Sequence, residues 1–499
     1  MKENMIQFKL RCKAYLSQLD INRLRAYGRS IGVESPTKKN KEELIDEIIA
    51  ILSGELEPVK QSNRGAPVKN DQVDQRIPAK IEEIKADCFK NDVMIDIPKY
   101  DFEAEYQKVL NDDSRMMRVA DPQEEARGFV SKIVSRGQVM LIEGEYYMFP
   151  LDCTETQEPT PIPLEIIEAH QLREGDCITC YNREKDGNAK VAVILSVNDV
   201  FVDDLKERRW FDDCGVCHSK DRIAFFKEDK YSTSVSKYID WLMPITKGQR
   251  ACIIAPPKAG KTKFLMQLVE SAQQLNRDLL ILTLLVDQSH ETVGEFRRVS
   301  KHNSVFYTTY EDEADRQVFV AEFLLKRAKR LAEAGKDVLI AVDSLSALAR
   351  AFNDTDASSG GKMLACGLET KTVHYIKKYF GSARCLEGGG SITIIGTACA
   401  NTGDPADDVL VRELSDLTTL EVHLSNEFAI KRVYPAIDFA KGYYKYSELF
   451  KSEIEEEIEF LLRNELLATI GSEGILKLLS ESNTFEEFSL KVKKMSKKQ

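Results

Sequence analysis

The chain has 499 residues and a net charge of −11, with 43% hydrophobic and 30% charged residues, a composition typical of soluble globular proteins. This length is too great for one core, so we expect three or more domains. No run approaches ~18 consecutive apolar residues, and the first segment, MKENMIQFKLRCKAYL, lacks the apolar stretch of a signal peptide. These features exclude a membrane-spanning helix and predict a cytoplasmic protein with mostly reduced cysteines. The charge argues against nucleic-acid contact over the whole surface but permits a local basic face.

The first 125 residues divide into a helical segment and a polar one. Residues 8–53 are predicted to form a small helical domain, because apolar residues recur at helical spacing in CKAYLSQLDINRLRAYGRSIGV and again in KEELIDEIIAIL. Basic residues between Arg23 and Lys41 fit a nucleic-acid-binding face and a solvated helix surface equally well. Residues 54–125 start as a polar linker with scattered Pro and Gly and continue as an acidic stretch to which we assign no fold.

The rest of the chain changes from short apolar runs to alternating strands and helices. Residues 126–200 contain runs such as GFVSKIV, GDCITCYN and AKVAVILSV between turn signals, a pattern typical of a small β-barrel of the OB type. After a connector, residues 201–240, apolar strands alternate with amphipathic helices over residues 241–450, which predicts a parallel sheet flanked by helices. Residues 451–499 are predicted to be a C-terminal helical segment.

The most specific motif is APPKAGKT, residues 255–262, between the predicted strand ACIIA and the predicted helix KFLMQLVES. This is the context of a phosphate-binding loop, although Ala255 replaces the usual first Gly. In such a loop Gly260 lets the backbone approach the phosphates, Lys261 reaches the β- and γ-phosphates, and Thr262 places its hydroxyl on Mg²⁺. Asp343, at the end of KDVLIAVD, fits the second acidic position that holds Mg²⁺ through water, and an ordinary strand-capping Asp is the alternative. The sequence therefore predicts binding of ATP and Mg²⁺.

Several motifs in one order resemble a known family. The stretches PITKGQRACIIAPPKAGKT, DVLIAVDSLSALARAFN, GGGSITIIGTA and LEVHLSNEFAIKRVYPAIDF are similar to transcription termination factor Rho, most strongly over about residues 235–450. The N-terminal helical segment resembles that family's N-terminal domain, and residues 126–200 fit the place of its cold-shock-like RNA-binding barrel. The resemblance implies a multidomain fold with a small helical N-terminal domain, an OB/cold-shock-like barrel and an α/β RecA-type P-loop ATPase domain.

The resemblance also implies partners and site residues. Rho proteins are hexameric ring helicases that bind single-stranded nascent RNA, act on RNA polymerase and pull RNA through a central channel with ATP. Gly361 and Lys362, in DASSGGKMLACG, resemble the RNA-contacting channel loop. Tyr434 falls where the family stacks an aromatic ring on adenine, and Arg432 would approach the phosphates. The implied cofactor-binding set is Lys258, Ala259, Gly260, Lys261, Thr262, Asp343, Arg432 and Tyr434, with Thr262 and Asp343 serving Mg²⁺.

Departures from the family concentrate on catalysis and the RNA path. Gln288 stands where the family has its water-activating Glu, and Ser289 where it has an Arg. Glutamine can orient a water but cannot take its proton, and Glu291 could substitute only if the loop were rebuilt. Lys445 aligns with the arginine finger and lacks the planar fork of guanidinium. A second channel loop, NTGDPADDV, carries Pro405 in place of a lysine.

The barrel departs from the family too. The RNA-stacking run of the family would fall near GQVMLI, residues 137–142, which contains no aromatic residue. Tyr146, Tyr147 and Phe149 are substitutes, unless they belong to the core; alternation along a strand sends Tyr147 and Phe149 to the same face.

Cysteine spacing raises two further possibilities. CGVCH, residues 214–218, matches a c-type haem attachment motif, which the absence of an export signal argues against. Cys177, Cys180, Cys214 and Cys217 form two C-x-x-C pairs that suit a zinc site, although strand geometry would point Cys177 and Cys180 to opposite faces.

Three hypotheses about function stay open, of which the third, a remote ring ATPase with another polymer substrate, is disfavoured by the GGK channel loop and the N-terminal segment. The first is a Rho-like termination factor and RNA-dependent ATPase whose hydrolysis is weakened by Gln288 and Lys445. The second is a non-hydrolysing Rho paralogue that acts as a regulatory or RNA-binding subunit, including in mixed rings with another Rho. Non-catalytic sites of rotary ATP synthases, which also carry Gln at this position, offer an analogy for the second.

Overall fold

The structure is a computed structural model that describes residues 12, 16, 19–33, 39–52, 56, 77–78, 80–81, 129–153, 158–185, 188–202, 208–228, 233–300, 304–355 and 362–497. The chain divides into two units, Met1–Asn111 and Asp112–Gln499, and each is described by itself. Among the described residues, every helix is too short or too polar to span a bilayer.

The first unit is helical, as the sequence predicts. Its helices are α2 (Ile21–Ile31) and α3 (Lys41–Leu52). Helix α2 ends at Gly32, whose left-handed φ of 92° suits a residue without a Cβ. Helix α3 begins with reciprocal bonds between Asn40 and Glu43, each backbone N–H donating to the other side chain at 2.9 and 3.1 Å. Leu24, Leu44 and Ile48 are buried between the helices.

The second unit begins with an antiparallel barrel-like sheet. Its strands are β1 (Phe129–Ile142), β2 (Glu145–Pro150), β3 (Thr160–Ile162), β4 (Cys177–Lys185), β5 (Asn188–Val197) and β6 (Val200–Phe201), with α7 (Leu164–Ala169) after β3. They pair in the order β3-β2-β1-β4-β5-β6. The turn between β1 and β2 places Glu143 and Gly144 at φ 51° and 90°, the geometry that favours tight hairpins. This sheet confirms the expected OB-like fold.

The ATPase domain is built on a nine-stranded sheet. Its strands are β7 (Val216–Cys217), β8 (Arg250–Ala255), β9 (Leu280–Gln288), β10 (Val305–Thr309), β11 (Asp337–Asp343), β12 (Arg384–Leu386), β13 (Ser391–Cys399), β14 (Leu420–His423) and β15 (Tyr443–Tyr444). The main order is β10-β9-β11-β13-β8-β14-β15, with β12 and β7 beside β13. The first six strands of this order are parallel, whereas β15, β12 and β7 pair antiparallel. The sheet is therefore mixed rather than wholly parallel.

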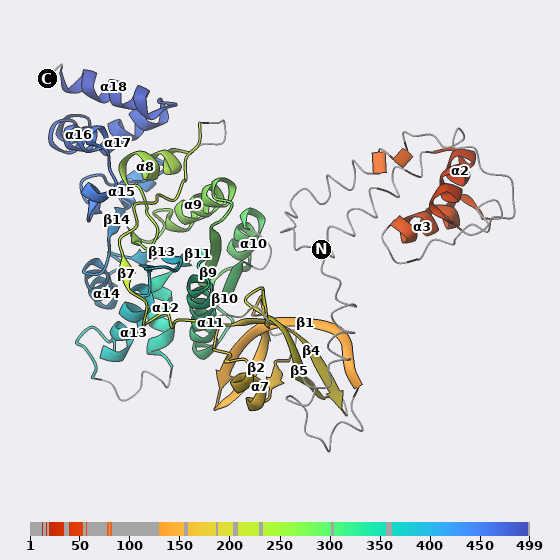
Figure 1. Cartoon of the computed structure of the whole chain (residues 1–499). Helices are drawn as coiled ribbons and strands as arrows, with labels where there is room; N and C mark the ends of the chain where they lie inside the picture. The colour runs from red at the N-terminus through yellow and green to blue at the C-terminus, as the bar shows by residue number, and fades with distance from the viewer. Residues whose placement is uncertain are drawn as a thin grey trace. The chain divides into compact units, whose positions relative to one another are not determined.

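Helices cover both faces of this sheet (Figure 1). They are α8 (Ser234–Leu242), α9 (Lys261–Leu275), α10 (His290–Val299), α11 (Ala314–Glu333), α12 (Leu345–Asn353), α13 (Thr370–Phe380), α14 (Pro405–Ser415) and α15 (Asn426–Ile430). Neighbouring strand residues belong to opposite cores: Ile253 packs with α8, α9 and α10, and Ile254 packs with α11 to α14. This alternation explains why the strands are apolar on every residue.

The chain ends in helices that extend the first of these cores. A 3₁₀ turn (Ser447–Leu449) precedes α16 (Glu453–Leu461), a π-helical turn (Leu462–Leu466), α17 (Leu467–Ser480) and α18 (Phe485–Ser496). Ile458, Leu479 and Phe488 are buried in the core that also contains α8. The expected C-terminal helices are thus part of the ATPase domain's packing.

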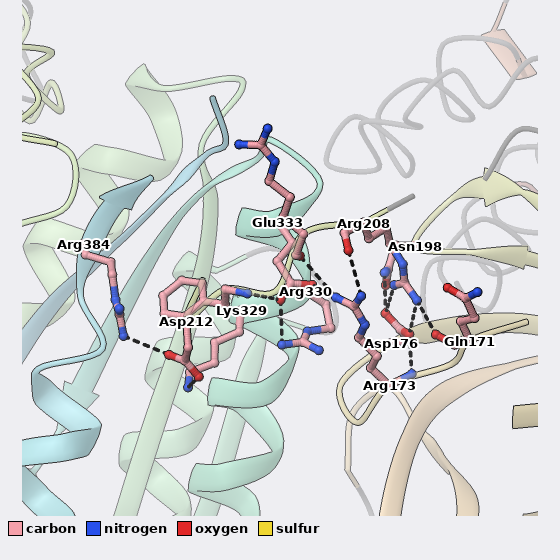
Figure 2. Close-up of polar contacts among 12 residues, drawn as sticks. Gln171, Arg173, Asp176, Asn198, Arg208, Asp212, Lys329, Arg330, Glu333 and Arg384 are labelled. Atoms are coloured by element: carbon pink, nitrogen blue, oxygen red, sulfur yellow. Dashed lines mark hydrogen bonds and ion pairs between the residues drawn. The ribbon is translucent and has the colours of Figure 1, made fainter. Parts of the chain in front are cut away.

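The barrel joins the ATPase domain through a charged and partly aromatic junction (Figure 2). The carboxylate of Asp176, which is 0% exposed, accepts bonds from Arg208 at 2.6 and 3.0 Å and from Asn198 Nδ2 at 2.7 Å. Arg173 reaches across to Glu333 of α11 at 3.3 Å, and Arg330 contacts the other oxygen of Glu333 at 2.8 Å. The connector after the barrel, whose described part is residues 208–228, is therefore held between the two parts of this unit.

Candidate nucleotide-binding site

The phosphate-binding loop joins β8 to α9, as the motif predicts. Gly260 is the N-cap of α9 with φ 90°, and Lys258 also has a positive φ of 64°. Lys258 is exposed, Ala259 is buried, and Lys261 and Thr262 are half-buried. The N-terminus of a helix of this length presents unpaired N–H groups and a positive dipole end to the loop, which suits a phosphate. The Nζ of Lys261 lies 3.0 Å from Cys399 Sγ at the end of β13.

Asp343 ends β11 in a fully buried position. Its Oδ1 accepts a bond from Thr397 Oγ1 at 2.6 Å. Its Oδ2 is buried and has no hydrogen-bond partner within the described residues. An uncompensated carboxylate oxygen is costly in a protein interior, so this atom suits an additional ligand. A carboxylate beside a hydroxyl and a phosphate loop fits Mg²⁺, which retains several waters in such sites.

Gln288 ends β9, the neighbour of β11 in the sheet. Its Nε2 lies 3.5 Å from the carbonyl oxygen of Asp343 and 3.4 Å from that of Val286. Both distances are at the outer limit for a hydrogen bond, so the amide is held loosely at the strand end. The position at which the resemblance predicts a catalytic carboxylate is thus adjacent to Asp343.

The two residues after Gln288 differ in what they do. Ser289 is the N-cap of α10, because its Oγ accepts a bond from Thr292 N at 3.2 Å. Glu291 is exposed in the first turn of α10, where hydrogen bonds to its own backbone N–H and to Ser289 lower the pKa of its carboxyl. The side chain of Glu291 is therefore engaged with the helix terminus.

Tyr434 lies over the phosphate-binding loop. A Cβ added to Gly260 would stand 3.6 Å from Tyr434 Cε2. The hydroxyl of Tyr434 donates to Gln267 Oε1 at 2.9 Å, and Lys263 Nζ lies 4.4 Å from the ring centroid. Arg432, two residues earlier, is exposed with φ 59°. The fold thus brings the predicted adenine-stacking residue to the predicted phosphate site.

Lys445 lies at the end of the sheet opposite the phosphate-binding loop, level with the amino-terminal end of β8. Its backbone N–H donates to Thr419 O at 2.8 Å, and Thr419 N donates to Arg250 O at 2.9 Å. Lys445 is therefore level with the first residue of β8, whereas the phosphate-binding loop follows Ala255, the last. Six residues of strand span about 17–20 Å, which is beyond the reach of a lysine side chain within the same chain.

The described parts of the two segments that resemble the family's channel loops precede or begin α13 and α14. Gly361 lies outside the described residues; Lys362 is exposed, and its carbonyl accepts from Thr370 N at 3.1 Å and Thr370 Oγ1 at 2.8 Å. Pro405 is the first residue of α14, where a missing N–H costs nothing. An open depression of about 430 Å³ lies on α12 and α13 and is lined by Phe352, Thr370, Lys371, His374, Tyr375 and Lys378.

The barrel segment that aligns with the RNA-stacking run faces the ATPase domain. Gln138, 0% exposed, donates from Nε2 to Phe323 O of α11 at 2.7 Å. Of the substitute aromatics, Phe149 packs on Phe319 of α11 with ring centroids 5.2 Å apart. Tyr147 is half-buried and donates to Glu145 Oε2 at 2.8 Å. Phe149 is therefore part of the junction rather than an open stacking platform.

The cysteine pairs separate in the fold. Cys177 and Cys180 lie in β4 of the barrel, whereas Cys217 lies in β7, opposite Cys385 of β12. In the described ranges of the chain, no three His, Cys, Asp or Glu side chains are grouped to hold a metal ion. The structure does not bring the four cysteines of the possible zinc site together.

Some residues at the site are missing from the sequence prediction. Thr397 and Cys399 contact Asp343 and Lys261 from β13, and Gln267 and Lys263 contact Tyr434 from α9. The alternation of β13 and the helical period after the loop contained the signal, because residues near a phosphate loop on adjacent elements must face it.

Comparison with known proteins agrees with this geometry. Residues 236–443 match the ATP synthase alpha/beta family, nucleotide-binding domain. Transcription termination factor Rho of Escherichia coli (strain K12) is 34% identical over 330 residues, which cover 64% of this chain and 78% of that protein. Rho of Buchnera aphidicola subsp. Acyrthosiphon pisum (strain APS) is 35% identical over 329 residues, with the same coverage.

Among solved structures, an ATPase from the type III secretion system of pathogenic bacteria is 22% identical with a TM-score of 0.43, covering 52% of this chain and 83% of that one. The residues matched by the family model, 236–443, include the phosphate-binding loop, Asp343 and Tyr434. The chain belongs to the transcription termination factor Rho family, and its ATPase domain is a nucleotide-binding domain of the ATP synthase alpha/beta type.

Proposed function

We propose that this protein is a Rho-like termination factor that binds ATP and RNA in a hexameric ring on nascent transcripts, with RNA polymerase as a partner and with weakened ATP hydrolysis. The proposed division assigns residues 8–53 to the N-terminal domain, 126–200 to the RNA-binding barrel and 241–450 to the ATPase domain. The phosphate-binding loop, Asp343 and Tyr434 supply the elements for nucleotide binding.

The observation that carries the proposal is the amide of Gln288 beside Asp343. A general base contributes ~10²–10⁴ to the rate of such a reaction, and an amide can only orient the attacking water. Hydrolysis without this base is slow unless another carboxylate replaces it. Glu291, three residues after Gln288, is engaged at the start of α10, and Asp287, the residue before Gln288, is exposed at the strand end.

Mg²⁺ completes the proposed site. When bound with ATP, the ion neutralises charge on the phosphates. Thr262 would supply its hydroxyl, and Asp343 would supply its unpartnered Oδ2 through water. Lys261 would leave Cys399 to contact the terminal phosphates.

The position of Lys445 supports a ring. Because it lies level with the start of β8, a contact with a transferring phosphate requires a nucleotide held by a neighbouring subunit. An arginine finger is worth ~10³–10⁵ in rate, and lysine keeps its charge but lacks the bidentate fork. Lys445, like Gln288, is therefore expected to slow ATP hydrolysis.

The RNA path in this proposal passes Lys362 and the depression on α13. Lys371, His374 and Lys378 are exposed along that helix, and Phe352 stacks on Tyr375 with centroids 4.0 Å apart. Cations beside aromatic rings suit a single-stranded polyanion. The barrel contribution is reduced relative to the family, because GQVMLI contacts α11.

A second candidate is a non-hydrolysing paralogue that acts as a regulatory or RNA-binding subunit, including in mixed rings. The observation that favours it is the combination of Gln288 and Lys445 with an otherwise complete nucleotide site. Both candidates require ATP binding, and they differ in turnover.

Phosphate release from the purified full-length chain, with and without single-stranded RNA, tests the proposal. We expect ATP binding that depends on Lys261 and a slow, RNA-stimulated release that exceeds that of Lys261→Ala. Release equal to that of Lys261→Ala, with ATP still bound by the unaltered chain, would select the paralogue. Equal ATP binding by Lys261→Ala and the unaltered chain would refute both candidates.

A further inference from the structure

Two cysteines distant in sequence face each other across paired strands. Cys217 of β7 and Cys385 of β12 are direct antiparallel partners, and their sulfur atoms lie 3.2 Å apart. Directly opposed residues of antiparallel strands have Cα atoms ~4.5–5.5 Å apart, and disulfides span ~4.4–6.8 Å between Cα atoms. The backbone already has the separation that a disulfide needs.

The backbone around Cys385 is closely packed. A Cβ added to Gly248, which has φ 83°, would stand 2.6 Å from Cys385 N and 3.0 Å from Cys385 Cβ. Two residues after Cys385, Glu387 N donates to Gly215 O at 2.9 Å, which continues the pairing of β12 with β7. The two thiols are therefore held opposite each other by both strands.

Solvent reaches this pair through a small cavity. Cys217 and Cys385 are both partly exposed. The cavity has a volume of about 60 Å³, and its lining includes His218, Tyr446 and the two cysteines. A space of this size holds water-sized molecules, and hydrogen peroxide is of that size.

We propose that Cys217 and Cys385 are a peroxide-oxidised thiol pair whose disulfide covalently ties the connector to the sheet of the ATPase domain. The Cys217 thiolate attacks one oxygen of hydrogen peroxide, the O–O bond breaks, and the departing hydroxide takes up the proton that the thiol lost. Cys217 becomes a sulfenic acid. Cys385 sulfur then attacks Cys217 sulfur, the S–O bond breaks, and the hydroxide leaves with the Cys385 proton as water. Two thiols and one peroxide give one disulfide and two waters.

The surroundings favour this order of events. Burial and the hydrogen bond with Cys217 raise the pKa of Cys385 to about 12, so Cys385 holds its proton while Cys217 is still a thiol. Lys247, which favours the charged form of the Cys385 thiol, offsets part of that rise in pKa. Cys217 is therefore the attacking thiol and Cys385 the resolving one.

The link would act on a segment that already connects two parts of the unit. Asp212 of the connector contacts Arg384, the residue before Cys385, at 3.2 Å (Figure 2). A bond between residues 168 apart in sequence would fasten the connector beside the barrel junction.

Peroxide treatment of the reduced full-length protein, followed by maleimide labelling and peptide mass mapping, tests the proposal. We expect a disulfide-linked pair of peptides that contains Cys217 and Cys385, and two fewer maleimide adducts than in the untreated reduced protein. Cys214→Ser, a matched change three residues away, keeps the link. Cys385→Ser loses it and accumulates a dimedone-reactive sulfenic acid at Cys217. The melting temperature rises by several degrees on oxidation only where the link forms, and dithiothreitol reverses the rise.

Met363, 59% exposed, serves as an internal standard, because its sulfoxide reports that peroxide acted on the sample. Maleimide on both Cys217 and Cys385 in a sample with oxidised Met363 would overturn the proposal. A disulfide between Cys214 and Cys217 would overturn it as well.

Discussion

Replacing Arg208 with Met should loosen the barrel from the ATPase domain. Arg208 donates to Asp176 Oδ1 at 2.6 Å, to Asp176 Oδ2 at 3.0 Å and to Gln171 O at 2.9 Å. The Asp176 side chain is 0% exposed and that of Arg208 is 19% exposed. The substitution retains much of the side-chain volume and removes the charge, which leaves a buried carboxylate without its cation.

The expected loss in the free energy of unfolding depends on the hydrogen bonds that Asp176 retains in the variant. Removing one partner of a buried ion pair costs ~3–5 kcal/mol in the free energy of unfolding. Asp176 retains Arg173 N at 2.7 Å and Asn198 Nδ2 at 2.7 Å, and the partial exposure of Arg208 lets water approach. We therefore expect the lower end, ~3 kcal/mol, which corresponds to a shift of ~1 M in the urea midpoint for a slope of ~3 kcal/mol per M.

Fluorescence of Trp210 provides a local measurement. The guanidinium of Arg173 lies 3.9 Å from the centroid of the Trp210 ring, so opening of the junction changes the environment of that ring. Trp241, the second tryptophan of the chain, is buried against Phe488 in the ATPase domain. A fluorescence transition that disappears in Trp210→Phe belongs to Trp210. This comparison separates opening of the junction from unfolding of the ATPase domain.

Arg136→Met is the matched control. Arg136 pairs with Asp199 on the barrel surface, with side chains 41% and 71% exposed, and such pairs contribute ~0–1 kcal/mol. If Arg208→Met shifts the Trp210 transition no more than Arg136→Met does, Asp176 and Arg208 do not hold the junction, and the reasoning from burial fails.

Three other changes test the site and the ATPase domain. Mg-ATP at 100 times its dissociation constant should stabilise the protein by ~2.7 kcal/mol, seen as a higher melting temperature that Lys261→Ala abolishes; equal temperatures with and without Mg-ATP would contradict the site. Gln288→Glu with Lys445→Arg should raise RNA-stimulated phosphate release by at least ~10³-fold, and an unchanged rate would show that the loss of turnover lies elsewhere. Burial raises the pKa of Asp240 to about 6 despite bonds from Phe226 N and Phe225 N. The folded state then binds more protons than the unfolded state between about pH 4 and 6, so stability should fall as pH rises through that window; Asp240→Asn should flatten this slope in urea titrations, and a slope that survives would assign it to other groups.

The fold was predictable where the spacing of apolar residues along the sequence is enough to identify a strand or a helix. The apolar runs of β8, β9, β11 and β13 and the strand–loop–helix context of Gly260 led to the ATPase domain. The pairing of Cys217 with Cys385 and the contact of Gln138 with Phe323 were not predictable, because residues 168 and 185 apart meet only through the assembled fold. Cys399 was missed although the alternation of β13 contained its signal, because the sequence alone does not show that β13 is the direct neighbour of β8 and pairs Cys399 with Ala255.

The residues predicted to depart from the family fall into two groups, those with a structural role in this fold and those whose side chains make weak contacts. Ser289 caps α10 and Pro405 starts α14, so restoring the family residue at either position removes a feature of a helix terminus, and loss of a cap costs ~1 kcal/mol. Gln138 is buried against α11, where an aromatic ring would need space that Phe323 O now occupies.

Gln288 and Lys445 have weaker ties. Among the residues that the structure describes, the Gln288 amide makes only contacts of 3.4 and 3.5 Å. Lys445 Nζ lies 5.4 Å from the centroid of the Tyr446 ring, a contact that Arg also makes. Reversal at these two positions should therefore leave the fold stable while it changes the chemistry. Under the proposed function, Gln288 and Lys445 are thus the two positions at which substitution measures catalysis rather than folding.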